Sequence, residues 1–460
     1  MFGIAIDRTS SRPVSLQLLE ALRGAVHEGR LPSGSALPST RKFAEELGIS
    51  RRLAAEIYDQ LVSEGYFTAK RGSGTWVRGG LSAAVRQARR PEPERPLPPV
   101  KYDFSPGIPD LGAFPRRAWL RAMDDALSFA AMRSLSYGPL QGEPELRAAV
   151  AAYLFRHRGI AADPGEIVIT AGTSHAFLLL SLLRISGAFY HEDPGSGFGR
   201  GAFLAAGTPV APVPVDADGA DPASLAPLAG SLIALNPSHQ FPTGTVLPIA
   251  RRLKFLEIAG QTGSFLIEDD YDSEFRLKGQ PVPALYALNP DRVLYLGSFS
   301  KSLAPFLRCG YLLAPPEIRT RLLSLARQVN ARTSGPTALA LARLLSSGQV
   351  DRHVFRQKRS YLKRQTVIVD WLNARGFPVS IRGRETGSHL YLEWSDRGFD
   401  GEFVRRCRDL GLRVVIGAEF HQNPERGRHA LVLGYGNIAE AKLPEGLALL
   451  ERELMTMKRL

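Results

Sequence analysis

The segment RRPEPERPLPP at residues 89–99 divides the chain into two parts that must fold separately. Ten of its eleven residues are proline, arginine or glutamate. Because proline fixes φ and lacks a backbone donor, this stretch cannot pack as a helix or strand and is typical of a stiff, extended spacer. The sequence therefore predicts a head at residues 1–80, a linker rich in proline and arginine at 81–100, and a body at 101–460.

The head has the pattern of three helices followed by a β-hairpin. In the first helical stretch, VSLQLLEALRGAVHEGRLPSG, the spacing of Leu16, Leu19, Leu22 and Val26 predicts one apolar face. The second stretch, LPSTRKFAEELG, begins with Ser39 as a candidate N-cap. The third, ISRRLAAEIYDQLVSEG, begins in the same way with Ser50. This order of elements is that of a winged helix-turn-helix domain.

Basic residues stand where such a domain meets DNA. Arg51 and Arg52 directly follow Ser50, so they occupy the first turn of the third helix, which enters the major groove. An arginine there can bridge the O6 and N7 atoms of guanine. Arg41, near the start of the second helix, suits a phosphate or base contact. A small helical domain with a solvated basic face is the alternative for each arginine taken alone.

The hairpin YFTAKRGSGTWV extends this surface. Its tip, with Arg71 and Gly72, offers cations and exposed amides to a DNA backbone or minor groove. The formal net charge of the whole chain is +13, but the charge is not concentrated at one end and by itself locates no partner. Binding of double-stranded DNA is therefore predicted from the motif rather than from the charge.

The body alternates short apolar strands with helical stretches. Continuous apolar strands separated by helices predict a mainly parallel α/β sheet covered by helices on both faces. Ligands of such sheets gather at the carboxyl ends of the strands. The predicted strands are 166–172, 187–193, 207–215, 231–236, 264–270 and 292–298.

A single lysine, Lys301, follows the last of these strands in the stretch SFSKSLAPFLR. A lysine that is desolvated or placed near other cations loses its proton more readily and becomes able to form a Schiff base. Pyridoxal phosphate (PLP) requires such a lysine, a carboxylate facing its pyridine nitrogen, and donors around its phosphate. Ser298, Ser300 and Arg308 are candidate phosphate donors.

Two further stretches supply the remaining parts of a PLP site. FLIEDDYDSEF ends an apolar strand with carboxylates, of which Asp269 is a candidate for the pyridine nitrogen, and Tyr271 can donate to the phenolic oxygen of the ring. A solvated acidic loop or a metal site are the alternatives for this stretch. ITAGTSHAF is a strand, a turn and a helix start, so Gly172 and Thr173 suit a phosphate.

The motifs of both parts resemble known families. The stretch from LPSTRKFAEELG to GSGTWV resembles the winged helix-turn-helix of GntR-type bacterial regulators. YGPLQGEPELR, ITAGTSHAF, NPSHQFPTG, EDDYDSEF and SFSKSLAPFLRCGYLLAP follow one another as in fold-type-I aminotransferases. Together they make the whole chain similar to the MocR/GabR family of PLP-dependent regulators.

This resemblance implies roles for particular residues. Lys301 is the Schiff-base lysine, and Asp269 rather than Asp270 faces the pyridine nitrogen. The tyrosine of YGPLQGE, Tyr137, reaches the phosphate bound by a neighbouring subunit, which implies an obligate dimer. In the family this homodimer is arranged head to tail.

The sequence departs from the aminotransferase pattern at two positions. EDPGSGFGR has Ser196 where a tyrosine usually stacks on the cofactor, and Phe198 is a candidate replacement. HALVLGYGN has Val432 where an arginine usually binds the substrate carboxylate. The candidate replacements for this arginine, and thus for effector binding, are Arg200, Arg384 and Arg428.

The prediction is a PLP-dependent, DNA-binding transcription regulator whose body senses an amine, an amino acid or PLP itself. The alternative is an active aminotransferase that is tethered to DNA by its head. Histidines without ligand spacing predict no structural metal, and two distant cysteines favour a reducing compartment. With no signal-peptide pattern and no long apolar run, the protein is expected in the cytoplasm.

Overall fold

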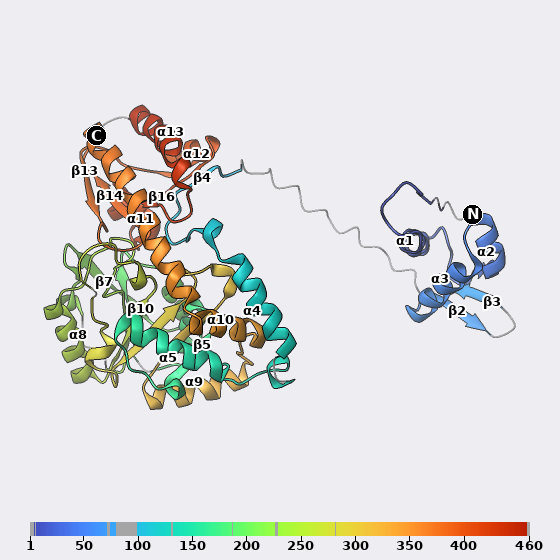
Figure 1. Ribbon diagram of the computed structural model, residues 1–460, viewed down its shortest axis with the longest axis horizontal. Coiled ribbons are helices and arrows are strands. Elements are labelled where there is room, and N and C mark those ends of the chain that lie inside the picture. The colour runs from blue at the N-terminus through green and yellow to red at the C-terminus, as the bar shows by residue number, and fades with distance from the viewer. Residues whose placement is uncertain are drawn as a thin grey trace. The chain divides into compact units, whose positions relative to one another are not determined.

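The computed structural model describes Ile4 and residues 6–70, 74–79, 99–129, 132–185, 187–225, 229–280 and 282–457 (Figure 1). The chain forms two compact units, Met1–Leu97 and Pro98–Leu460. Arg71, Gly72 and the predicted linker up to residue 98 lie outside the described residues. Each unit is described by itself below.

The first unit contains the predicted three helices and hairpin. Its elements are α1 (Val14–His27), β1 (Ala36–Leu37), α2 (Thr40–Leu47), α3 (Arg51–Ser63), β2 (Phe67–Lys70) and β3 (Gly74–Val77). The strands form an antiparallel sheet in the order β1-β3-β2. Ser39 and Ser50 cap α2 and α3, because their hydroxyl oxygens accept from the amides of Lys42 at 3.3 Å and Leu53 at 3.1 Å.

The apolar face predicted for α1 is confirmed at Leu22 and Val26, which are buried, and at Leu19, which packs partly buried against them, but it is wrong at Leu16. Leu16 is 39% exposed, whereas Leu18 and Leu22 are fully buried in the core of the unit. Ala25 completes this buried face at helical spacing from Leu18 and Leu22. The prediction failed because VSLQLLEAL offers leucines on more than one face.

The second unit is built on an eight-stranded sheet in the order β5-β12-β11-β10-β9-β6-β7-β8. All six predicted strands are present, with the following bounds: β5 (Ile167–Thr170), β6 (Phe189–Asp193), β7 (Val210–Asp216), β9 (Leu232–Leu235), β10 (Phe265–Asp270) and β11 (Val293–Ser298). β12 (Gly310–Leu313) and β8 (Gly219–Ala220) run antiparallel to their neighbours, and the central pairs are parallel. The predicted mainly parallel α/β sheet is confirmed.

Helices cover both faces of this sheet (Figure 1). Along β11, Val293 and Tyr295 join one buried apolar cluster, while Leu294 and Leu296 join another. This alternation explains why the strand is apolar throughout. The helices of the unit are α4 (Arg116–Phe129), α5 (Pro144–Arg158), α6 (Thr173–Leu182), α7 (Gly197–Ala205), α8 (Ile249–Thr262), α9 (Pro316–Gln328), α10 (Gly335–Ser346), α11 (Gln349–Arg375), α12 (Gly401–Asp409) and α13 (Leu443–Thr456).

A second, smaller sheet follows α11. It is antiparallel, in the order β13-β14-β17-β16, and its strands are β13 (Val379–Arg382), β14 (His389–Trp394), β17 (Ala430–Gly434) and β16 (Val415–Ile416). A short parallel pair joins β15 (Leu412–Arg413) to β4 (Tyr102–Asp103). Within the described parts of the chain, no helix is both long and apolar enough to cross a membrane.

Candidate functional site

The strand pairing brings the predicted pocket residues to one edge of the large sheet. Ser298 at the end of β11 lies opposite Gly310 of β12, and Gly310 lies opposite Thr170 at the end of β5. The loops that leave this row carry Lys301, Arg308 and Gly172. Of these three residues, Gly172 and Arg308 are the farthest apart in the sequence, by 136 positions.

Lys301 lies in the loop that follows β11, and its side chain is held by a hydrogen bond to the backbone. Its Nζ donates a hydrogen bond to the carbonyl of Gly107, and a Cβ on Gly107 would lie 2.9 Å from the same Nζ. Burial lowers the pKa of Lys301, and the carboxylates of Asp272 and Asp269 oppose this effect. A buried lysine with a lowered pKa is a better nucleophile at neutral pH than a solvated one.

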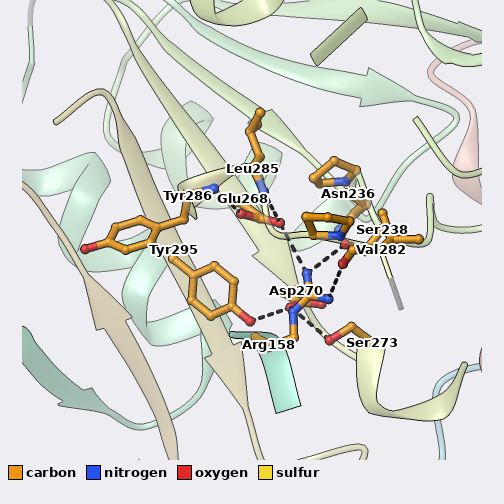
Figure 2. Close-up of polar contacts among 12 residues, drawn as sticks. Arg158, Asn236, Ser238, Glu268, Asp270, Ser273, Val282, Leu285, Tyr286 and Tyr295 are labelled. Carbon is orange, nitrogen blue, oxygen red and sulfur yellow. Dashed lines mark hydrogen bonds and ion pairs between the residues drawn. The ribbon is translucent and has the colours of Figure 1, made fainter. Parts of the chain in front are cut away.

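The two adjacent aspartates at the end of β10 have different surroundings. Asp270 forms an ion pair with Arg158 at 2.7 Å and accepts from the hydroxyls of Ser273, at 2.9 Å, and Tyr295 (Figure 2). Asp269 has a buried carboxylate oxygen without a hydrogen-bond partner among the described residues. Burial, and then the neighbouring Asp270, raises the pKa of Asp269 to about 7, while Lys301 lowers it.

A buried histidine orients Tyr271. His239 Nδ1 lies 2.8 Å from the Tyr271 hydroxyl and 2.9 Å from a carboxylate oxygen of Asp272. Because a carboxylate only accepts, Nδ1 carries the proton that His239 donates. The hydroxyl proton of Tyr271 is then available to another acceptor in the pocket.

His389 completes a buried group that the sequence did not predict. The ligand-type atoms of His239, Asp272 and His389 lie within 4.8 Å of one another. His389 Nε2 donates to the carbonyl of Pro242 at 3.1 Å, and burial lowers the pKa of His389 to about 3. NPSHQFPTG and HLYLEW contain these histidines, but nothing in their spacing pairs them with Asp272.

The candidate phosphate donors meet beside the first turn of α6. Gly172 has a φ of 95° and precedes Thr173, the first residue of α6, whose N-terminus attracts anions. A Cβ on Gly172 would lie 3.8 Å from the Arg308 guanidinium. Ser298 and Ser300 share a hydrogen bond of 2.9 Å between their hydroxyls. Arg308 is exposed, and no anionic partner for it is present among the described residues.

Ser196 and Val432, the two departures from the aminotransferase pattern, lie in different environments. Ser196 lines a cavity of about 30 Å³ together with Glu192, Arg200 and Asp269. Burial raises the pKa of Glu192 to about 8. Val432 is fully buried and packs with three neighbours, namely Tyr391, Phe420 and Ala430.

The candidate effector residues are not gathered at one place. Arg200 lines the same cavity as Asp269. Phe198 is 72% exposed, and Arg384 is exposed as well. Arg428 pairs with Glu425 at 3.2 Å. Of these four effector candidates, only Arg200 lines a cavity together with a predicted cofactor residue, within the part of the chain that the structure describes.

Tyr137 is 73% exposed, and the Arg332 guanidinium lies 5.6 Å from the centre of its ring.

In the first unit, Arg41, Arg51 and Arg52 are exposed on the first turns of α2 and α3. Arg52 pairs with Glu56 at 2.9 Å, whereas Arg51 has no such partner among the described residues.

Both parts of the chain match established protein families. Residues 14–77 match the family of bacterial regulatory proteins of the gntR type, and residues 100–432 match the aminotransferases of class I and II. The solved α-aminoadipate aminotransferase LysN of Thermus thermophilus is 26% identical, with a TM-score of 0.69 over 77% of this chain and 92% of LysN. The fold and the site thus define a DNA-binding regulator joined to an aminotransferase-like body.

Two curated relatives have the same organisation along most of their length. The probable rhizopine catabolism regulatory protein MocR of Rhizobium meliloti is 30% identical over 99% of this chain and 96% of its own length. The pyridoxine biosynthesis transcriptional regulator PdxR of Corynebacterium glutamicum is 35% identical over 80% of this chain and 81% of its own. The chain belongs to the MocR family of GntR-type transcription regulators, as the sequence predicts.

Proposed function

We propose that this regulator holds PLP at Lys301 and that the state of this site controls how the head binds DNA. The observation that carries the cofactor is the unpartnered, buried carboxylate oxygen of Asp269, in the same electrostatic field as Lys301. A cationic ring nitrogen would pair with this carboxylate and remove the penalty of burying it. PLP, when bound, supplies an electrophilic carbonyl carbon and an electron-accepting ring.

The residues around Lys301 divide the remaining work. Burial favours the neutral amine of Lys301, which is the reactive form. Tyr271, whose oxygen faces the His239 N–H, presents its own proton to a phenolic oxygen. The phosphate is held by three kinds of donor. These are the backbone amides at Gly172 and Thr173, the hydroxyls of Ser298 and Ser300, and the guanidinium of Arg308.

The head binds double-stranded DNA through α3. Arg51, exposed and without an ion-pair partner among the described residues, is the base-reading candidate, and Arg41 contacts phosphate or base edges. The hydroxyl oxygens of Ser39 and Ser50 accept helix-capping bonds, so only their protons are free to donate to DNA phosphates.

The working form is a head-to-tail homodimer. α4 and the segment after it expose large apolar side chains that a soluble monomer rarely leaves uncovered. These side chains, with their exposed fractions, are Leu120 (67%), Leu127 (53%), Phe129 (78%), Met132 (86%) and Tyr137 (73%). A second copy that covers this surface would also bring its Tyr137 to the phosphate donors described above.

The signal is an amine, an amino acid or PLP itself. Val432 and its neighbours form a buried apolar cluster, which cannot neutralise a carboxylate as an arginine does. Steady transamination of ordinary α-amino acids is therefore disfavoured, although the fold is shared with LysN. Arg200, which lines the same cavity as Asp269, is the candidate cation for an anionic effector.

The test uses the purified protein, PLP and a panel of amines. A sensor gives a spectral change that is stoichiometric with protein and a change in operator affinity, without continuing formation of keto acid. Continuing keto-acid formation would instead identify an aminotransferase. A change of operator affinity with PLP alone would identify PLP as the signal, as the name of the relative PdxR suggests.

A further inference from the structure

The body contains a second polar cavity, which the proposed cofactor site does not use. Its volume is about 220 Å³. It is lined by the end of α5 with Arg158, by the segment 273–276, by Lys358 of α11 and by Thr386. Figure 2 shows Arg158 with its neighbours Ser238 and Ser273, which belong to the same lining.

Most cations around this cavity are already neutralised. Asp351 pairs with Arg156 at 3.2 Å and with His157 at 2.5 Å. Asp270 pairs with Arg158. These residues therefore shape the cavity but contribute little free charge to it.

Lys358 and Arg276 differ from them. Lys358 is half-buried and makes no ion pair or hydrogen bond with any described residue. Arg276 pairs with Glu385, whose side chain is 60% exposed, and its Nε is buried without an acceptor. Glu274 also lines the cavity, but burial raises its pKa to about 7, so it carries only part of a charge at neutral pH. Burial lowers the pKa of Lys358 and the carboxylate of Glu274 opposes this effect, as expected for a cation that lacks full compensation.

Two buried hydroxyls add donors to this set. Ser238 Oγ accepts from Arg158 at 2.9 Å, and Thr386 Oγ1 accepts from Arg276 at 3.4 Å. Since both oxygens face guanidinium N–H groups, both hydroxyl protons point elsewhere. A lysine, a free guanidinium N–H and two hydroxyl protons around one space are complementary to an oxyanion.

We propose that this cavity binds a small oxyanion, inorganic phosphate or a phosphate monoester, between Lys358, Arg276, Ser238 and Thr386. A single water needs only about 10–15 Å³, and pockets for larger organic ligands begin at about 300 Å³. The cavity therefore has room for a hydrated small anion rather than for a large ligand.

An anion here would join segments that are far apart in the sequence. Backbone bonds already link Leu277 to Glu385 at 2.7 Å and Gly387 to Phe275 at 2.9 Å. Ser238 is adjacent to His239 along the chain, and Ser273 is adjacent to Asp272. The anion would hold the segments that position Tyr271 and link them to α11, so the cavity is coupled to the cofactor pocket through the backbone.

The test is isothermal titration of the full chain with inorganic phosphate, after borohydride reduction with PLP and removal of excess PLP. We expect one phosphate per chain. Lys358→Gln removes a charged hydrogen bond and weakens phosphate binding by about tenfold or more. Thr386→Val, which keeps the shape of the side chain, weakens it as well.

Lys363→Gln is the matched control, because Lys363 lies on the same helix and is exposed. It should bind phosphate as the wild type does. No binding by the wild type, or equal losses in both lysine variants, would overturn the proposal. The comparison of the two lysines holds whether or not PLP binds at Lys301, so failure here is distinct from failure of the proposed function.

Discussion

Arg158 binds Asp270 through an ion pair of 2.7 Å, with only 6% and 3% of the two side chains exposed. Arg158 also donates to the carbonyl of Val282 at 2.8 Å and to Ser238. Asp270 is thereby committed to the interior of the body. The adjacent Asp269 is left as the carboxylate with a free oxygen beside Lys301.

Substitution of the two aspartates should separate stability from cofactor binding. Asp270→Asn removes the nearer of the two carboxylates that pair with the buried Arg158 and leaves only Glu268, at 3.6 Å, so we expect the free energy of unfolding of the body to fall by up to about 3–5 kcal/mol. Asp269→Asn should leave the cofactor-free protein at least as stable as the wild type but weaken PLP binding. Urea denaturation and PLP titration measure the two effects. Equal destabilisation by both substitutions would contradict this division of roles.

The raised pKa of Asp269 predicts a particular pH dependence in the cofactor-free protein. Its pKa is about 7 in the folded chain and 3.8 as an ordinary aspartate, so between these values the folded state holds a proton that the unfolded state has lost. This contribution to stability is full below about pH 4 and declines as the pH rises to about 7. Asp269→Asn removes this pH dependence, because asparagine does not titrate.

The measurement is the difference in unfolding free energy between wild type and Asp269→Asn from pH 4 to pH 8. The wild type should lose stability relative to the variant up to about pH 7 and then run parallel to it. A constant difference over the whole range would show that Asp269 is not protonated in the folded protein.

Ser50 should have two separable roles, as helix cap and as DNA contact. Ser50→Ala removes the acceptor for the Leu53 amide and should destabilise the head by about 0.5–2 kcal/mol. Ser50→Asp keeps an acceptor and the stability but places a negative charge against DNA phosphates. Thermal unfolding and DNA binding distinguish the variants, and full DNA affinity of Ser50→Asp would place this helix end away from the DNA.

Arg51 should read the base sequence. Arg51→Ala is expected to lower affinity for a selected operator by about 1–3 kcal/mol and to change non-specific binding less. Arg12→Ala is the control, since Arg12 lies before α1 and pairs with Glu20 at 2.6 Å. Fluorescence anisotropy with operator and random duplexes measures both. Equal losses on the two duplexes would reduce Arg51 to a phosphate contact.

Much of the fold follows from local pattern. Six strands of the body were predicted from their apolar runs, and in β11 the division of Val293–Leu296 between two clusters shows that such a run is buried on both faces of the sheet. β12 was not predicted, because Gly310–Leu313 follows the lysine loop too closely to be set apart as an element. On α1 only Leu16 was placed wrongly in the core, because leucines occur on several sides of this helix.

The parts of the site that sequence could not supply are long-range pairs. Arg158 is 112 positions from Asp270, and nothing in either motif indicates that they meet. The pairing of His239 with Asp272, and their approach to His389, likewise require the fold. Family resemblance favoured Asp269 over its neighbour, and the ion pair of Asp270 supplies a physical reason for that preference.

The central claim is that PLP at Lys301 changes how the head binds DNA. The most direct measurement is the affinity for a selected operator with and without PLP, for the wild type and for Lys301→Ala. We predict a change of about fivefold or more in the wild type and none in the variant, since a coupling between two sites is typically worth 1–3 kcal/mol. An operator affinity that does not respond to PLP, or that responds equally in both proteins, would contradict the claim.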